Sequence, residues 1–108
     1  MAGDDPIRGH VDSMVLGALQ SGPTHGYGLV LRLRELSEGA FDLKEGTLYP
    51  ALHRLERAGK LESTRTRDSG RERRVYALTP LGEQALQEER VAWTVFSRGM
   101  RGVLGSSG

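Results

Sequence analysis

Hydrophobic positions in the first third of the chain recur with the period of an α-helix. Val11, Met14, Val15, Ala18 and Leu19 predict an amphipathic helix that Gly22-Pro23 ends. A second helix is predicted after Thr24 as its N-cap and before Ser37-Glu38-Gly39, with a buried face of Leu29, Val30, Leu33 and Leu36. Gly26 and Gly28 near its start suggest close backbone approach or a weak first turn.

A third helix is predicted from its buried positions Leu48, Leu52, Leu55 and Ala58. Gly59 ends it, and its start lies between Lys44 and Thr47, with Thr47 as a candidate cap. Pro50 lacks an N–H, so it must lie in the first turn or two. The preceding residues 41–43 are either a short strand or an extended entry to this helix.

After Gly59 the spacing of hydrophobic positions changes from that of a helix to that of β-strands. Residues 61–67 and 73–78 read as the two strands of a hairpin that turns at Asp68-Ser69-Gly70, with Tyr76 and Leu78 on one face. Thr79-Pro80 then marks a helix start, and that helix can run to about Leu104. The fold class predicted is mainly α with a two-stranded β wing: a winged helix-turn-helix over 7–78, a C-terminal dimerisation helix over 79–104 and a flexible tail over 105–108.

Composition narrows the function classes. The chain has 108 residues, the size of one domain, and no cysteine, which excludes disulfides, thiolate nucleophiles and cysteine zinc sites. No apolar run is long enough to span a membrane, and the acidic N-terminus is unlike a secretory signal. We expect a cytoplasmic protein without membrane association.

Charge is unevenly distributed along the chain. The net charge is +1, but residues 57–76 hold seven cations against three carboxylates, so the remainder carries a net −3. Segregation of this kind indicates that one part of the molecule contacts a polyanion.

The exposed face of the third helix gathers cations, a hydroxyl and an aromatic ring. Its members are Lys44, Thr47, Tyr49, Pro50, His53, Arg54 and Arg57. Such a helix fits the DNA major groove, where side chains reach base edges and flanking cations hold phosphates. The alternative is an ordinary solvated helix face.

The predicted hairpin carries an arginine cluster: Arg65, Arg67, Arg71, Arg73 and Arg74. Phosphate contacts explain such a cluster, because each neutralised phosphate releases counterions and strengthens binding. The alternative is an edge hairpin that its charges protect from aggregation. Helix and hairpin together favour double-stranded DNA as the partner.

An apolar seam runs along the terminal helix at steps of seven, three, four and three. It comprises Leu86, Trp93, Phe96, Met100 and Val103. A chain of this size has too small a core to bury the whole helix, so a second copy is expected to cover its outer half. Packing against the first helix of the same chain is the alternative.

Three segments carry a resemblance to a known family. They are His25-Gly26-Tyr27-Gly28, the run from Glu45 to Gly59, and the run from Gly70 to Gly82. They resemble the PadR family of transcriptional regulators, over about residues 7–93, and the short C-terminal region is similar to the subgroup with a single terminal helix.

The resemblance implies a dimeric repressor that binds an inverted repeat in a promoter and is released by a small aromatic or hydrophobic ligand. Tyr49 and the third-helix cations match the family's DNA-contacting region, and residues 70–74 match its wing. Trp93 resembles the tryptophan that faces a pocket between subunits in drug-responsive members, with Phe96 and Met100 expected to line the same site. Plain interface packing is the other role open to Trp93.

Catalysis has no support in the sequence. His10, His25 and His53 share no metal-ligand spacing, and neither a Ser/His/Asp order nor a phosphate-binding glycine loop is present, so no catalytic residue, metal or cofactor is expected. Two competing classes remain: a winged-helix protein-interaction module without DNA binding, and a small-molecule carrier. Neither accounts for the arginine cluster.

Overall fold

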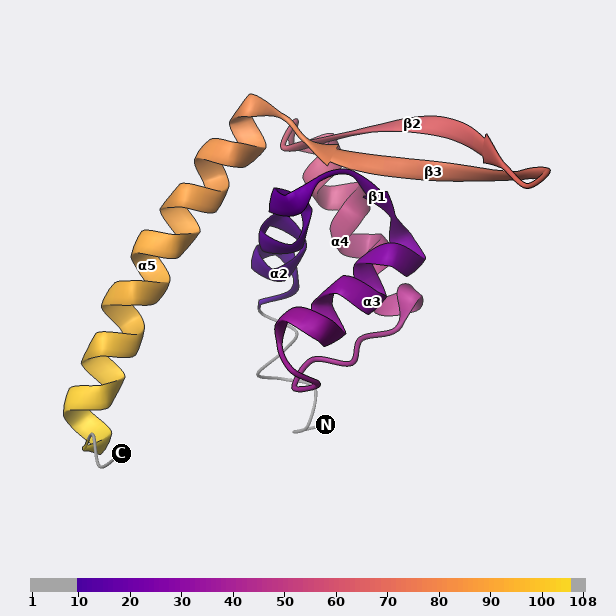
Figure 1. Cartoon of the computed structure of the whole chain (residues 1–108). Helices are drawn as coiled ribbons and strands as arrows, with labels where there is room; N and C mark the ends of the chain where they lie inside the picture. The colour runs from indigo at the N-terminus through magenta and orange to yellow at the C-terminus, as the bar shows by residue number, and fades with distance from the viewer. Residues whose placement is uncertain (1–9, 106–108) are drawn as a thin grey trace.

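The computed structural model describes residues 10–105, and its elements follow the predicted order (Figure 1). They are α2 (Val11–Ala18), the 3-10 turn η1 (Leu19–Ser21), β1 (Thr24–His25), α3 (Gly26–Leu36), α4 (Glu45–Arg57), β2 (Leu61–Asp68), β3 (Arg71–Leu78) and α5 (Pro80–Leu104). The winged-helix prediction is confirmed. The expectations for residues 7–9 and for the tail at 106–108 lie outside the described residues.

The sheet has three strands in the order β1-β3-β2, not the two that the sequence predicts. The added strand pairs Thr24 with Tyr76 and His25 with Val75 in antiparallel register. Thr24 is therefore not the N-cap of α3. That position belongs to His25, whose Nδ1 accepts a hydrogen bond from the Gly28 N–H at 3.1 Å.

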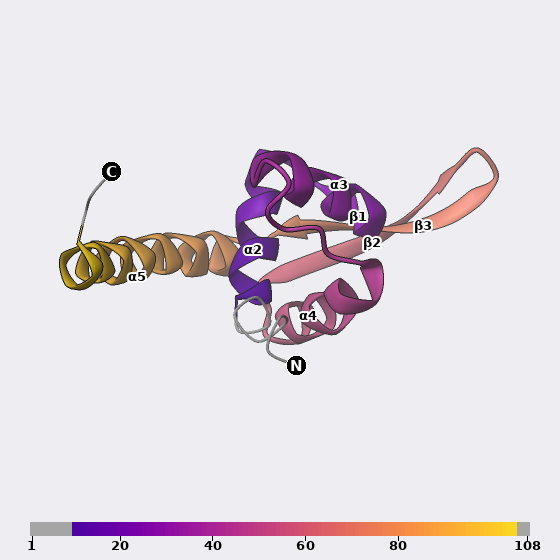
Figure 2. The same ribbon diagram turned by 90° about the horizontal axis from the view of Figure 1, so that it is seen from below.

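The β2–β3 hairpin is regular from Leu61↔Leu78 to Asp68↔Arg71. Its two-residue turn holds Ser69 at φ 54° and Gly70 at φ 75°, the left-handed pair of a type I′ turn that suits strand twist. The outer half of the hairpin extends beyond the helices (Figures 1 and 2).

The core lies between the sheet and helices α2, α3 and α4, with Tyr76 among its most buried side chains. Two predicted core positions are wrong. Leu36 is 64% exposed because α3 ends at that residue, and Ala58 is the exposed C-cap of α4. Ala51, one turn before Leu55 in α4 and fully buried, faces the core instead.

Helix α4 begins one residue after Lys44, within the predicted range. Thr47 is not its cap but lies inside the first turn, where its N–H donates to the Lys44 carbonyl at 2.9 Å. Pro50 lies in the second turn on the exposed face, as its missing N–H requires. Residues 41–43 form no strand, although Leu43 is buried in the core.

Helix α5 starts at a tight junction with the end of α4. The Thr79 Oγ1 accepts from the Gly82 N–H at 3.0 Å and donates to the Gly59 carbonyl at 2.6 Å, which confirms the predicted cap. A Cβ at Gly82 would overlap the Lys60 carbonyl oxygen.

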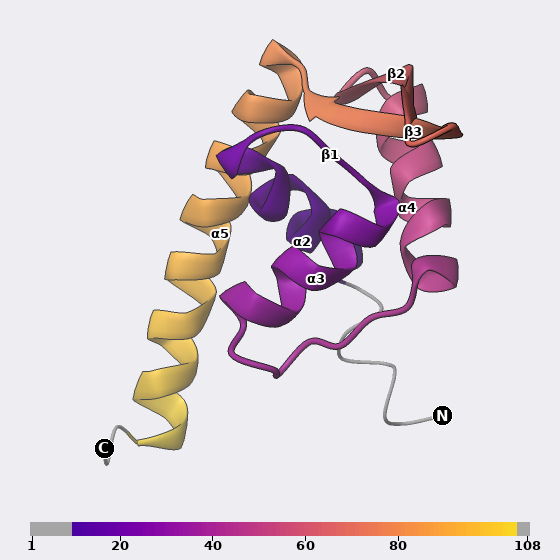
Figure 3. The ribbon, with the colours of Figure 1, turned by 45° about the vertical axis from the view of Figure 1, so that its right-hand side comes forward.

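Beyond its contact with α2, α5 leaves the body of the molecule. Of the residues that the structure describes in this helix, only Gly82 and Leu86 are buried, and the helix projects on the side opposite the hairpin (Figures 2 and 3). The molecule is elongated as a result, at 53 × 28 × 24 Å. Within residues 10–105, no helix is long and apolar enough to cross a bilayer.

Candidate nucleic-acid interface

The face of α4 that the sequence singles out is exposed. Leu48, Ala51, Leu52 and Leu55 turn inward, which leaves the predicted set outward: Thr47, Tyr49, Pro50, His53, Arg54 and Arg57, with Lys44 exposed just before the helix. This arrangement follows from the helical period alone.

Arg54 does not stand alone on this face. Its Nη2 lies 2.7 Å from the Asp12 Oδ1 of α2, in an exposed ion pair. The hydrogen bond to Asp12, followed by the charge of that carboxylate, raises the pKa of Arg54 above its ordinary value. A DNA phosphate or base would compete with Asp12 for this guanidinium.

The hairpin arginines divide into two groups. Arg65, Arg67 and Arg71 are exposed, and of these Arg67 and Arg71 lie next to the turn. Arg74 donates to the Ser63 hydroxyl at 3.0 Å, and Ser63 in turn donates to the Glu56 carboxylate of α4 at 2.7 Å. This chain of contacts fixes the base of the hairpin against α4.

Arg73 is half-buried and lies against His25. Its Nη1 is 3.0 Å from Nε2 and 3.3 Å from Nδ1 of the imidazole. Its Nε is buried with no hydrogen-bond partner among the described residues. Arg73 is therefore held against the start of α3, although its partner Thr66 lies closer to the turn than Arg65 does. Its place in the sequence groups it with the arginines expected to contact phosphate.

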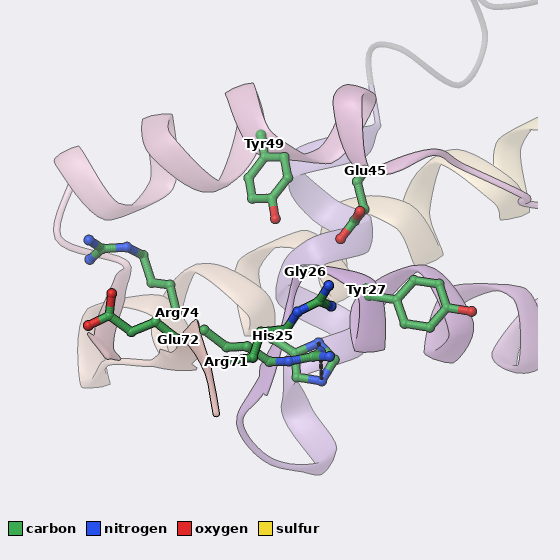
Figure 4. Close-up of a pocket in the computed structure, with 9 residues that line it drawn as sticks. His25, Gly26, Tyr27, Glu45, Tyr49, Arg71, Glu72 and Arg74 are labelled. Atoms are coloured by element: carbon green, nitrogen blue, oxygen red, sulfur yellow. Dashed lines mark hydrogen bonds between the residues drawn. The ribbon is translucent and has the colours of Figure 1, made fainter. Parts of the chain in front are cut away.

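A cleft of about 550 Å³ lies between the start of α4 and the hairpin (Figure 4). Tyr49 and Glu45 point into it from α4, opposite side chains of β3. The full lining is His25, Gly26, Tyr27, Glu45, Tyr49, Arg71, Glu72, Arg73 and Arg74. Across the cleft, Tyr49 from the exposed face of α4 lies opposite the three arginines of β3, and the carboxylates of Glu45 and Glu72 also line it.

Tyr49, 41% exposed, also explains the glycine at the start of α3. A Cβ built on Gly26 would lie 3.0 Å from the Tyr49 hydroxyl oxygen. The close approach suggested by the sequence is present here and at Gly28, where a Cβ would meet the Thr24 side chain. Both glycines thus keep the start of α3 close to neighbouring side chains.

Tyr76, two residues after the cleft residue Arg74 on β3, is almost fully buried. Burial, and next the nearby Glu56 carboxylate, raise the pKa of its phenol, while Arg74 acts in the opposite direction. This side chain is a core residue that supports the base of the hairpin.

A second cleft, of about 540 Å³ and largely apolar, lies between α2 and α5. Its lining includes Trp93 and Leu86 from α5 together with Met14 and Phe41. The Trp93 indole meets the His10 ring edge-on at 5.8 Å between centroids. Part of α5 thus packs on α2 of the same chain, the alternative that the sequence leaves open.

The outer part of the predicted seam is uncovered. Phe96 contacts Trp93 at 5.6 Å between ring centroids, while Met100 and Val103 lie beyond the second cleft. Trp93 is 55% exposed, Phe96 56% and Val103 81%. The side chains of Trp93, Phe96, Met100 and Val103 thus form an uncovered apolar stripe on a projecting helix. An exposed stripe of this kind is suited to contact with another protein surface.

Sequence reasoning misses the roles of two residues in this region. It considers His25 only as a metal ligand, yet this residue caps α3 and contacts Arg73. It does not single out Asp12, although that carboxylate pairs with Arg54. For the cap, the sequence offers one signal, a histidine beside two glycines at the start of a helix. For the Asp12–Arg54 pair it offers none, because the two residues are 42 positions apart.

Comparison with known proteins agrees with this architecture. Residues 15–88 match the Transcriptional regulator PadR-like family. A transcriptional regulator of Mycobacterium tuberculosis is 46% identical over 69 residues, a match that spans 64% of this chain and 64% of that protein.

Solved structures give the same result. A transcriptional regulator from Clostridium thermocellum superposes with a TM-score of 0.80 at 30% identity, over 90% of this chain and 92% of that one. Bacillus subtilis PadR in complex with operator DNA superposes with a TM-score of 0.67 at 26% identity, over 74% of this chain and 46% of that one.

Proposed function

This chain belongs to the PadR-like family of transcriptional regulators, and from that premise we propose that it is a homodimeric repressor that binds an inverted-repeat operator. Members of the family are transcriptional regulators, so the chain is a regulator and not an enzyme. A regulator of promoters acts where the DNA is, and the proposal therefore includes a cytoplasmic location.

The observation that carries the proposal is the cleft that Tyr49 of α4 shares with Arg71, Arg73 and Arg74 of the hairpin. It places the exposed face of α4 beside hairpin arginines, so a single duplex would contact both. Side chains of α4 would reach base edges in the major groove, and hairpin arginines would hold flanking phosphates. The similar fold of Bacillus subtilis PadR with operator DNA supports this orientation.

Dimerisation would come from the uncovered stripe of α5. Residues 79–104 would act as the dimerisation element and residues 7–78 as the DNA-binding domain. Two-fold symmetry would set the two α4 helices about 34 Å apart, one turn of DNA.

We further propose that a flat aromatic or hydrophobic ligand binds beside Trp93 and releases the repressor. The largely apolar cleft between α2 and α5 supports this role, and a second copy would enclose it further. Because Trp93 is the single tryptophan of the chain, its fluorescence reports this site alone. Titration with flat aromatic compounds should quench it; no response to any of them would assign Trp93 to packing.

The function is tested by selecting bound duplexes from a random-sequence pool. We expect an inverted repeat with half-sites one helical turn apart, and affinity that falls steeply as salt rises. Enrichment of no sequence, with no salt-dependent binding, would reject the repressor in favour of a protein-interaction module.

A further inference from the structure

Resting on the proposed DNA-binding function, we propose that His25 is a positioning residue that ties the hairpin to the start of α3, and that protonation of its imidazole weakens DNA binding. His25 lies where three elements meet. It is the last residue of β1, which pairs with β3, and the N-cap of α3, and it lines the cleft beside α4.

The first contact of the ring is the cap. The Nδ1 accepts from the Gly28 N–H at 3.1 Å, so this nitrogen carries no proton and the neutral ring holds its proton on Nε2. On the imidazolium both nitrogens are donors. A proton on Nδ1 would then face the Gly28 N–H, and the cap would be broken.

The second contact is with the hairpin. The Arg73 Nη1 is nearly equidistant from the two ring nitrogens, at 3.0 and 3.3 Å. Cε1 of the imidazole lies between the two ring nitrogens. If Nη1 were in the plane of the ring at these distances, it would clash with Cε1, so the guanidinium lies over the face of the ring. A neutral ring accepts a cation on its face. An imidazolium would place two like charges in contact.

Both contacts of His25 therefore require the imidazole to be neutral. Arg73 is two residues before the β3 partner of His25 and leads directly into the exposed end of the hairpin. Without these contacts the hairpin would be released from α3 and its alignment with α4 disturbed. A duplex that touches both α4 and the hairpin would bind less tightly.

Other charges around the ring partly cancel. Two carboxylates, two further guanidinium groups and two phenols line the same cleft: Glu45 and Tyr49 from α4, Tyr27 from α3, and Arg71, Glu72 and Arg74 from β3. Phosphates of bound DNA would favour the imidazolium, but salt screens them over about 8 Å at 0.15 M. The direct contacts with Gly28 and Arg73 are not screened in this way. They therefore determine the direction of the effect, which is that protonation of His25 weakens DNA binding.

The test uses two proteins matched at every other histidine. They are the unmodified chain and H25N, which both keep His10 and His53 and therefore differ at His25 alone. Asparagine keeps an N-cap acceptor but has neither a titratable ring nor a ring face for Arg73. Affinity for the duplex selected with the unmodified protein is measured by fluorescence anisotropy at constant 0.15 M salt between about pH 8 and pH 5.5, where histidines titrate.

We expect the unmodified chain to lose about tenfold more affinity than H25N as the pH falls, the size of effect expected from the loss of one hydrogen bond. His10 and His53 are present in both proteins and contribute equally to the two profiles. Equal slopes, or a steeper loss in H25N, would overturn the inference while leaving the proposed function intact. Absence of binding by both proteins would reject the inference and the proposed function together.

A second measurement needs no DNA. The backbone amide signal of Gly28 in the unmodified chain should shift over the same range of acid pH in which affinity declines, because its acceptor Nδ1 becomes protonated. A Gly28 amide signal that does not change over this range would also overturn the inference.

Discussion

The Arg54 guanidinium of α4 is held 2.7 Å from the Asp12 carboxylate of α2, on the face that we propose contacts DNA. One negative charge thus lies beside a cation that phosphates need. Both side chains of the pair are exposed, so the pair contributes little to the stability of the fold. Its significance lies in binding, where Asp12 competes with the duplex.

Replacing this carboxylate should strengthen DNA binding. In D12N the Arg54 side chain is released from its ion pair, and the repulsion between the Asp12 carboxylate and the DNA phosphates disappears. Affinity for all duplexes should therefore rise about two- to fivefold at low salt. Equilibrium binding by anisotropy measures the change. D42N is the matched control, because Asp42 forms a similar exposed pair with Arg34 at 2.9 Å on a different surface. An equal gain in both variants would indicate a general charge effect.

The exposed arginines of the hairpin should act on every sequence alike. R67A and R71A each remove a cation near the tip. If each arginine neutralises one phosphate, each substitution should lower the slope of log affinity against log salt by about 0.9, with base preference unchanged. R98A, on α5, removes the same charge elsewhere and should leave the slope unaltered. An unchanged slope in the hairpin variants would remove the hairpin from the interface.

Which features can be read from the sequence follows from the range of the interactions involved. The helices, the long hairpin and the Thr79 cap depend on neighbours within a few residues, and periodicity and turn chemistry reveal them. The exposed face of α4 follows from its buried face. These predictions need no knowledge of the tertiary structure.

The features that sequence reasoning misses depend on partners far along the chain. Strand β1 has two residues, too few for a pattern, and exists because β3 offers an edge about 50 residues later. Thr24 is a suitable cap by residue type, but pairing with Tyr76 draws it into the sheet and leaves the cap to His25. The Asp12–Arg54 pair likewise depends on how α2 packs against α4.

Gly82 should tolerate no side chain. A Cβ there would overlap the Lys60 backbone carbonyl, which cannot move without displacing the junction between α4 and α5. We expect G82A to lower the free energy of unfolding by about 1–3 kcal/mol in urea denaturation. G99A in the same helix meets nothing within 4 Å and should raise stability by about 0.5–1 kcal/mol. Similar effects of the two substitutions would contradict the close approach.

Tyr76 should make folding sensitive to alkali. Burial raises the pKa of its phenol above the ordinary 10.0, so the folded state favours the protonated form. That stability is fully present below pH 10 and is lost as the pH rises through the folded value. The melting temperature of Y76F should therefore fall less between about pH 9 and pH 11 than that of the unmodified chain. Y27F, at a half-exposed tyrosine, should follow the unmodified chain.

The uncovered stripe of α5 should determine whether the protein can bind DNA at all. In W93A/F96A two large apolar side chains leave the surface that we assign to the second copy. Buried aromatic anchors dominate such interfaces, so the variant should be monomeric at micromolar concentration in sedimentation experiments. It should also lose affinity for the inverted repeat, because only a dimer engages two half-sites. V91A/V95A removes exposed apolar groups from the other side of the helix and should remain dimeric. If W93A/F96A stays dimeric, the subunits meet through a different surface, and the spacing of the α4 helices must then be derived from that surface.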